Sequence, residues 1–565
     1  MDILVLQVVQ FITRVMLIFP IPLLKIVIQM MGAIYNNHGN IDIFNSEFKE
    51  CHADRYAGVI YNRGHLNIFD SKFVGCYANN YAGVIYNQQN TFNCYNSSFI
   101  NNNVGVLGGV VFNYLGDCNF DNAEFINNSA VYGTIYDWSG RTNINNTKFI
   151  NNTAIRGTAL YAWENSKCVI INSTFKNNFA SDAGGVIYSH NRNKLDLINS
   201  AVNIDIYNST FVDNIAGNYA GAILSAFTKV NIQNTTFVNN TSNGHGGTLY
   251  NCKGMFIISD SDFLGNYANE SGGIIFSNNG VNVISNSNFI NNSARYCGGV
   301  INGDLNSTIK NSNFINNSAA YGGCIMDEIA DIENCVFINN SAAESGAIES
   351  GHLNLINSTF YNNNAKGVGI VAVENGNIMN STFANNHALK NTIVYSVNNL
   401  NLKNNINLSD SQIFIEKNLI RVNVTQDLSN MIFTTEDGFI GLCIQLGMIN
   451  STRVFITNNT DLVIDTDGNN VFDYLKILIY LNCTKQINID LKDFQSYVHR
   501  FTNNVTYGNL SEDVINKIIG LYDSGFRVPS HNATYILENK TQATINFYVG
   551  AAAAVQNLFM FIPFK

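Results

Sequence analysis

A phenylalanine recurs along most of the chain at a nearly constant interval, most often within the sequence Phe-Ile-Asn-Asn. Successive members of the series lie 23 to 26 residues apart, except for a single step of 36 residues. The fourteen positions are Phe48, Phe73, Phe99, Phe125, Phe149, Phe175, Phe211, Phe237, Phe263, Phe289, Phe314, Phe337, Phe360 and Phe383. A period of this length is typical of repeat proteins, in which each unit buries its apolar face by stacking on its neighbours.

A glycine motif of the form Gly-x-Ile-Tyr alternates with the phenylalanine series, beginning at Gly32 and becoming less regular at Gly369. Both series contain the 36-residue step at the same place, so about ten additional residues belong to one repeat. They lie near residues 189–201 and include Arg192 and Lys194. We expect them to form a loop that leaves a single coil and joins it again.

Within each repeat, short apolar segments alternate with polar residues at a period of two, as in Val230-Asn-Ile-Gln-Asn234. Gly, Asn, Asp and Ser separate these segments, and no repeat contains a helical stretch of ten residues. The pattern predicts two or three short strands per unit. A unit of this size fits one coil of a parallel β-helix, with neighbouring coils about 4.8 Å apart. We therefore predict an all-β fold with about 14 coils.

The recurring residues have physical roles in such a β-helix. The phenylalanines would stack inside the coils and bury a large apolar area. An Asn follows most of them after three residues, as Asn152 follows Phe149. Its amide could bond the coils above and below, and Asn also tolerates the left-handed backbone of a corner. The motif glycines would permit a positive φ or a close approach between coils.

Two stretches carry a resemblance to known families: Phe314-Ile-Asn-Asn-Ser-Ala-Ala-Tyr-Gly-Gly323 and Phe289-Ile-Asn-Asn-Ser-Ala-Arg-Tyr-Cys-Gly-Gly299. The paired G-G-A-I and F-x-x-N motifs resemble the repeats of chlamydial polymorphic outer membrane proteins. The Asn-rich version more closely resembles the adhesin-like surface proteins of methanogenic archaea. The resemblance covers residues 32–400 and implies a right-handed parallel β-helix of the pectin-lyase type at the cell surface. It does not imply an activity, because this fold carries both lyases and inert stalks.

The first 31 residues are apolar but are interrupted by Arg14, Pro20 and Pro22. Three interpretations remain open for this segment. It is a degenerate signal or anchor, the remnant of a β-helix whose upstream coils lie outside this sequence, or a cap over the edge of the first coil.

Residues 401–565 lack the repeat and are richer in Asp, Glu and Lys. They predict a small β-rich C-terminal module, with an immunoglobulin-like arrangement as the nearest expectation. One short helix is predicted from Ser511 to Asp523, because Ser511 can cap it, Glu512 and Asp513 favour its first turn, and Gly525 follows its end.

The composition excludes some functions. Acidic side chains outnumber basic ones by 41 to 31, and only 13% of the residues are charged. Sparse Lys and Arg argue against a nucleic-acid partner, which requires a basic surface to neutralise phosphates. The 11 cysteines include no C-x-x-C pair, so we predict no zinc site. No motif indicates another metal or a cofactor.

Cys51 and Cys76 each stand three residues after a repeat phenylalanine, where Asn stands in most other coils. Stacked coils would bring their Cα atoms within the range of a disulfide. The alternative is that two small side chains simply replace two members of the Asn series.

A polysaccharide lyase or glycoside hydrolase would require carboxylates and a basic side chain in a groove of the β-helix. Asp327, Glu349 and His352 are the candidates in the last coils, and Arg192 of the insertion is a candidate base. We interpret the acidic residues of these coils instead as a solvated face. The regular repeat also argues against an enzyme, because catalytic residues usually interrupt such patterns.

The sequence therefore predicts a non-enzymatic, adhesin-like protein of the cell surface or extracellular space. Its expected partners are host or neighbouring-cell surfaces and their glycans, with an association with a membrane or cell wall. The alternative is a lyase or hydrolase that acts on polysaccharides along one face of the β-helix.

Overall fold

A computed structural model describes most of the β-helix and parts of the C-terminal region. The chain divides into two compact units, Met1–Ser293 (unit 1) and Ala294–Lys565 (unit 2). The described residues are 17–19, 32–191, 203–367, 369–415, 420–427, 432–435, 440–443, 453–457, 465, 467, 469–489, 491–503, 510–530, 533–536, 542–551 and 558–564.

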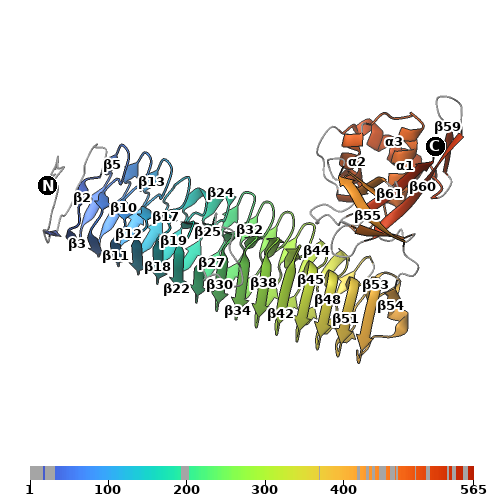
Figure 1. Ribbon diagram of the computed structural model, residues 1–565, viewed down its shortest axis with the longest axis horizontal. Helices are drawn as coiled ribbons and strands as arrows, with labels where there is room; N and C mark the ends of the chain where they lie inside the picture. The colour runs from blue at the N-terminus through green and yellow to red at the C-terminus, as the bar shows by residue number, and fades with distance from the viewer. Residues whose placement is uncertain are drawn as a thin grey trace. The chain divides into compact units, whose positions relative to one another are not determined.

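Each coil of unit 1 is built from short strands joined by tight corners (Figure 1). In a typical coil, β14 (Val111–Tyr114) and β15 (Asp117–Asp121) belong to one sheet and β16 (Glu124–Ile126) to a second. β14 pairs in parallel with β10 (Ile85–Gln88) of the preceding coil and β17 (Ile135–Trp138) of the following coil. The predicted parallel β-helix of about 14 coils is confirmed.

The recurring phenylalanines lie at the centres of the fourteen strands of the second sheet, and all of them are buried. In unit 1 the rings of successive coils stack with centroids 4.5–5.1 Å apart, which confirms the predicted internal stack. The strands are β4 (Glu47–Lys49), β8 (Lys72–Val74), β12 (Ser98–Ile100), β16, β19 (Lys148–Ile150), β23 (Thr174–Lys176), β27 (Thr210–Val212), β31 (Thr236–Val238), β35 (Asp262–Leu264), β39 (Asn288–Ile290), β43 (Asn313–Ile315), β46 (Val336–Ile338), β49 (Thr359–Tyr361) and β52 (Thr382–Ala384).

The Asn that follows three residues later forms a buried hydrogen-bonded ladder. Asn152 accepts bonds at Oδ1 from the backbone N and the Nδ2 of Asn128, at 2.9 and 3.0 Å. Its own Nδ2 donates to the carbonyl of Phe125 at 2.9 Å and to Oδ1 of Asn178 at 3.1 Å. Each amide therefore joins the coils on both of its sides, as the sequence predicts.

The left-handed backbone of this corner belongs to a different residue from the one expected. It is the residue before the ladder Asn that has a positive φ, as in Asn151 (φ 55) before Asn152 and Asn127 (φ 55) before Asn128. In Phe-Ile-Asn-Asn, the first Asn therefore turns the chain, and the second Asn forms hydrogen bonds to the neighbouring coils.

The paired glycines also have two separate roles. Gly184 has a φ of 61°, which a residue with a side chain rarely adopts. Gly185 lies so close to the next coil that a Cβ there would be 1.9 Å from the carbonyl oxygen of Gly221. The first glycine therefore supplies the turn, and the second allows the coils to approach.

A second, unpredicted ladder holds the corner of the first sheet. Asn62 donates to Asn87, and Asn87 donates to Asn113, at 2.8 and 2.9 Å between Nδ2 and Oδ1. In the next coil Asp137 occupies this position, fully buried. It accepts bonds from the backbone N of Gly140, at 2.8 Å, and from two neighbouring hydroxyls.

Asp137 should make the stability of unit 1 depend on pH. Burial raises the pKa of its carboxyl group from 3.8 to about 6. Because the pKa of Asp137 is higher in the folded protein than in the unfolded chain, binding of a proton to Asp137 stabilises the folded protein. This contribution is fully present below about pH 4 and is lost as the pH rises through about 6. Asp137→Asn restores the ladder amide, so we expect it to raise the free energy of unfolding at pH 8 by about 1–3 kcal/mol. Urea unfolding of both proteins at pH 4 and pH 8 measures this, and an equal pH dependence in the variant would contradict it.

The insertion leaves the register of the coils unchanged. β25 (Ile187–His190) precedes it and β26 (Ile204–Tyr207) follows it. β26 pairs in parallel with β22 (Lys167–Ile171) of the preceding coil and β30 (Lys229–Gln233) of the following one. This agrees with a loop that leaves one coil. Residues 192–202, including Arg192, lie outside the described residues.

β1 (Leu17–Phe19) pairs in parallel with β3 (Asn40–Phe44) of the first coil. This pairing does not decide among the three interpretations of residues 1–31, which all stay predictions.

The last coils, in unit 2, have a simpler outline than the others. Where the repeat shortens to 23 residues, the corner between the two strands of the first sheet is lost. β41 (Ile301–Gly303) and β42 (Asn306–Lys310) are still separate. The strands that follow are each continuous over nine or ten residues: β45 (Ile325–Glu333), β48 (Ile348–Ile356), β51 (Val371–Met379) and β53 (Val394–Lys403).

The β-helix extends beyond the predicted boundary at residue 400, because β54 (Ile413–Ile415) still pairs in parallel with β53. The module that follows is β-rich but not immunoglobulin-like. Its seven strands form a single antiparallel sheet in the order β58-β55-β56-β57-β61-β60-β59, and an additional pairing of β58 with β60 closes six of them into a ring. They are β55 (Ile420–Asp427), β56 (Ile432–Thr435), β57 (Ile440–Cys443), β58 (Arg453–Thr457), β59 (Ala533–Ile536), β60 (Gln542–Ala551) and β61 (Leu558–Phe564).

The described part of the module contains three helices, so the prediction of a single helix is wrong. α3 (Glu512–Asp523) is the predicted one, and Gly525 follows it with a φ of 86°. α1 (Phe472–Cys483) was missed because it is apolar on nearly all sides and lacks a one-sided pattern. α2 (Leu491–Asn503) does show an amphipathic period, which a search for helices would have found.

Candidate functional site

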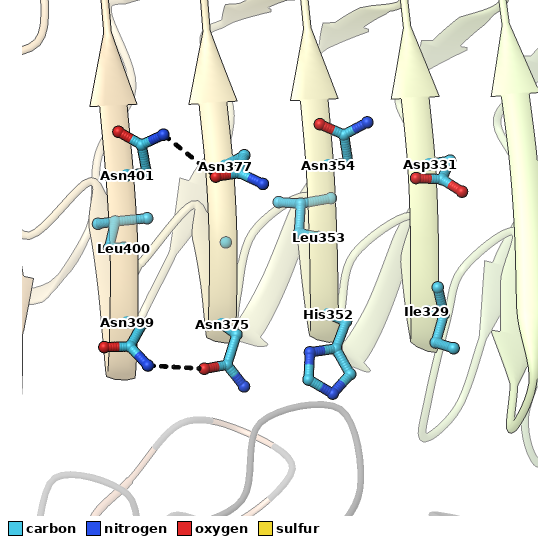
Figure 2. Close-up of a pocket in the computed structure, with 11 residues that line it drawn as sticks. Ile329, Asp331, His352, Leu353, Asn354, Asn375, Asn377, Asn399, Leu400 and Asn401 are labelled. Atoms are coloured by element: carbon cyan, nitrogen blue, oxygen red, sulfur yellow. Dashed lines mark hydrogen bonds between the residues drawn. The ribbon is translucent and has the colours of Figure 1, made fainter.

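An open groove of about 410 Å³ lies on the outer face of the last coils of unit 2 (Figure 2). It crosses four neighbouring strands, β45, β48, β51 and β53. The residues that line it are Ile329, Asp331, His352, Leu353, Asn354, Asn375, Gly376, Asn377, Asn399, Leu400 and Asn401. Five of these eleven residues are asparagines, and none is Lys or Arg.

Two rows of side chains border the groove because the four strands pair in parallel with one another. The first row is Asp331, Asn354, Asn377 and Asn401. The second row is Ile329, His352, Asn375 and Asn399. Members of one row are about 4.8 Å apart, and the rows are two residues apart along each strand, about 6.6 Å.

The amides of the groove are only partly used for bonds to one another. Asn401 donates to Asn377 at 3.3 Å and Asn399 to Asn375 at 3.4 Å, both from Nδ2 to Oδ1. The side chain of Asn354 has no hydrogen bond within the part of the chain that the structure describes. Long bonds and an unengaged amide leave donors and acceptors for a ligand.

A comparable outward row in unit 1 is bonded more tightly. There, Asn143 donates to Asn119 and Asn119 to Asn93, each at 2.7 Å from Nδ2 to Oδ1. These amides continue one ladder from coil to coil. This row does not continue unbroken to the groove, because Val169, Ile257 and Val283 occupy its register position in coils between them.

Between the two rows, the floor of the groove is the backbone of the strands. Leu353, Gly376 and Leu400 occupy the middle position on three successive strands. Because side chains alternate along a strand, this position points away from the two rows. Leu353 is accordingly 3% exposed, and a Cβ on Gly376 would lie 3.2 Å from Cγ2 of the buried Val373.

Asp327, a candidate of the enzyme hypothesis, is not in the groove. It is 1% exposed and pairs in register with Gly303, at the position that the corner residues have in earlier coils, and Ser307 donates a hydrogen bond to its Oδ2. Burial raises the pKa of Asp327 to about 7. It has the same structural position as Asp137 and the corner asparagines.

Glu349 lies elsewhere. Its register neighbours are Met326 and Ala372, so it stands one position away from the row of Asp327, on the opposite side of the strand. It is 3% exposed. Asp327 and Glu349 therefore do not converge.

His352 is the one candidate that lines the groove. It lies three residues from Glu349, on the order of 10 Å along the strand. Arg192 is outside the described residues, so its position relative to His352 is not defined. The structure thus brings none of the three described candidates, Asp327, Glu349 and His352, together.

Only some acidic residues of these coils, such as Asp331 and Glu333, are partly exposed as the sequence suggests. Glu344, Glu349 and Glu374 are all buried, with 3–6% of their surface exposed. Ala372, the register neighbour of Glu349, belongs to one apolar cluster with residues of α1. Among the described residues, no group of three or more His, Cys, Asp or Glu side chains could hold a metal ion.

Cys51 and Cys76 are buried free thiols in this structure. The backbone N of Cys76 donates to Oδ1 of Asn102 at 2.9 Å, so Cys76 continues the buried Asn ladder. A side-chain hydrogen bond with the neighbouring Cys51 thiol, together with burial, raises the pKa of Cys76. The pair therefore occupies the ladder positions, and an oxidised bridge between them stays a prediction.

Sequence reasoning missed the groove, although one signal was available. The repeat shortens from 25 to 23 residues after Phe314, which marks the coils whose corner is lost. Comparison of the chain with family models, with curated proteins and with solved structures finds no match. Within the described residues, no helix is both long and apolar enough to span a membrane.

Proposed function

We propose that this protein is a non-enzymatic, adhesin-like protein of the cell surface or extracellular space, and that it binds glycans of host or neighbouring cells. One observation carries the proposal. The groove of unit 2 is bordered by five asparagine amides on a rigid sheet, and no basic residue lines it.

Amides suit a ligand that is rich in hydroxyl groups. Each Asn side chain offers two donors and an acceptor oxygen, and a sugar hydroxyl can both donate and accept. The parallel pairing of the four strands holds these amides in place before a ligand arrives, which lowers the entropic cost of binding. A fixed array of neutral hydrogen-bonding groups therefore favours recognition of a glycan.

The positions of the acidic residues also favour binding over catalysis. A general acid or base must lie within hydrogen-bond reach of the reacting group. Asp327 and Glu349 are both buried and do not line the groove, whereas His352 does. The lyase or hydrolase hypothesis would need a different set of residues.

A glycan array probed with the full-length protein tests this proposal. We expect saturable binding that the double substitution Asn354→Ala and Asn377→Ala weakens. Asn119→Ala is the matched control, because it removes an outward Asn of another coil. A parallel assay should find no cleavage of uronate polymers or host glycans. Release of unsaturated or reducing ends, or binding to no glycan, would overturn the proposal.

A further inference from the structure

The groove runs across the strands and therefore along the direction in which the coils of unit 2 stack. Each row contributes one side chain per coil, at intervals of about 4.8 Å, and the four strands span about 14 Å. A linear polymer lying in the groove would meet equivalent groups at every coil. The geometry thus favours a chain whose repeat is close to the spacing of the coils.

The cross-section of the groove limits the kind of polymer. Two rows of polar side chains border it, and Gly376 between them carries no side chain. A pyranose ring with equatorial hydroxyls carries C–H groups on its faces and hydroxyls on its rim. One face can lie on the backbone between the rows while the rim hydroxyls reach the amides of Asn354, Asn375 and Asn377.

The charges of the groove disfavour an acidic ligand. Asp331 supplies a carboxylate, and none of the lining residues is Lys or Arg. A chain of uronates would meet this carboxylate and find no counter-charge in the lining. A neutral chain meets no such penalty.

We infer that the groove binds a neutral, extended β-1,4-linked glycan, with one sugar residue for each coil. Linkage through equatorial positions gives a flat ribbon, whose advance per sugar is close to the spacing of the coils. An α-1,4 linkage instead winds the chain and removes the sugars from register with the amide rows. This inference rests on the proposed function and specifies its ligand.

Calorimetric titration of the full-length protein tests the inference. The neutral β-1,4 probes are cellohexaose, mannohexaose and chitohexaose, and the comparison probes are maltohexaose and hexagalacturonate. We expect at least one neutral β-1,4 probe to bind at least about 10-fold more tightly than both comparison probes. Asn354→Ala and Asn377→Ala should each weaken this binding by about 2- to 10-fold, and Asn119→Ala should not change it. Thermal unfolding of each variant verifies that it remains folded.

The possible failures are distinguishable. Equal or tighter binding of maltohexaose or hexagalacturonate, or unchanged binding by both groove variants, overturns the inferred ligand and leaves glycan binding in place. The inference is also overturned if none of the three neutral β-1,4 probes binds to the protein. Only the absence of binding across the wider glycan array overturns the proposed function as well.

Discussion

Replacing Asn152 with alanine is expected to lower the free energy of unfolding of the surrounding coils by about 2–6 kcal/mol, because it leaves buried polar groups without partners. The side chain accepts from the backbone N of Asn128 and donates to the carbonyl of Phe125. Asn152 and Asn128 are completely buried, so water cannot replace the lost bonds. Native-state hydrogen exchange should show the loss of protection in the coils on both sides of residue 152.

Asn119→Ala is the control for this effect. Asn119 makes equally short bonds to Asn93 and Asn143, but it lies on the outer face and is half-buried. Water can satisfy the groups that its removal exposes, so we expect a change of less than about 0.5 kcal/mol. Equal effects of the two substitutions would show that burial does not set the strength of the ladder.

Replacing Phe149 with alanine should destabilise the same region by about 3–5 kcal/mol, the usual effect of deleting a large buried aromatic side chain. Its ring stacks on Phe125 at 4.5 Å and on Phe175 at 5.1 Å between centroids, and it is fully buried. The substitution opens a cavity inside the coil and interrupts the stack. Urea unfolding combined with hydrogen exchange measures the effect and locates it.

Phe179 provides a matched control in the neighbouring coil, because 44% of its surface is exposed. Phe179→Ala should change stability by less than about 1 kcal/mol. A solenoid is stabilised mainly by contacts between neighbouring coils, so the effect of Phe149→Ala should decrease within a few coils of the substitution. A uniform loss of protection throughout unit 1 would contradict this local behaviour.

The β-helix was predictable because each recurring residue has the same role in every coil. A phenylalanine such as Phe149 is a weak signal alone, but fourteen in phase leave few alternative folds. The finer assignment within Phe-Ile-Asn-Asn was not predictable. Asn suits both a left-handed corner and a buried ladder, and only the structure separates Asn151 from Asn152.

The groove and the buried acids were harder to predict for two physical reasons. Asn354 and Asn377 resemble many other asparagines in this chain, and what distinguishes them is that the side-chain hydrogen bonds of their row are few and long. The burial of Glu349 was not evident from its own repeat, because its register neighbour Ala372 packs in an apolar cluster with residues of α1, which are distant in sequence. α1 was missed because Leu475, Ile477 and Leu478 give an apolar run without helical periodicity.

The uniform register of the coils has an evolutionary consequence. Asn128, Asn152 and Asn178 each present the same donors and acceptors to the next coil, and the 36-residue repeat keeps this arrangement intact. Unequal recombination between such similar segments could therefore add or delete a whole coil without leaving a bond unmatched. The strands that line the groove near the end of the β-helix would be inherited unchanged while the number of preceding coils changed, so lineages could differ in length and still keep the same groove.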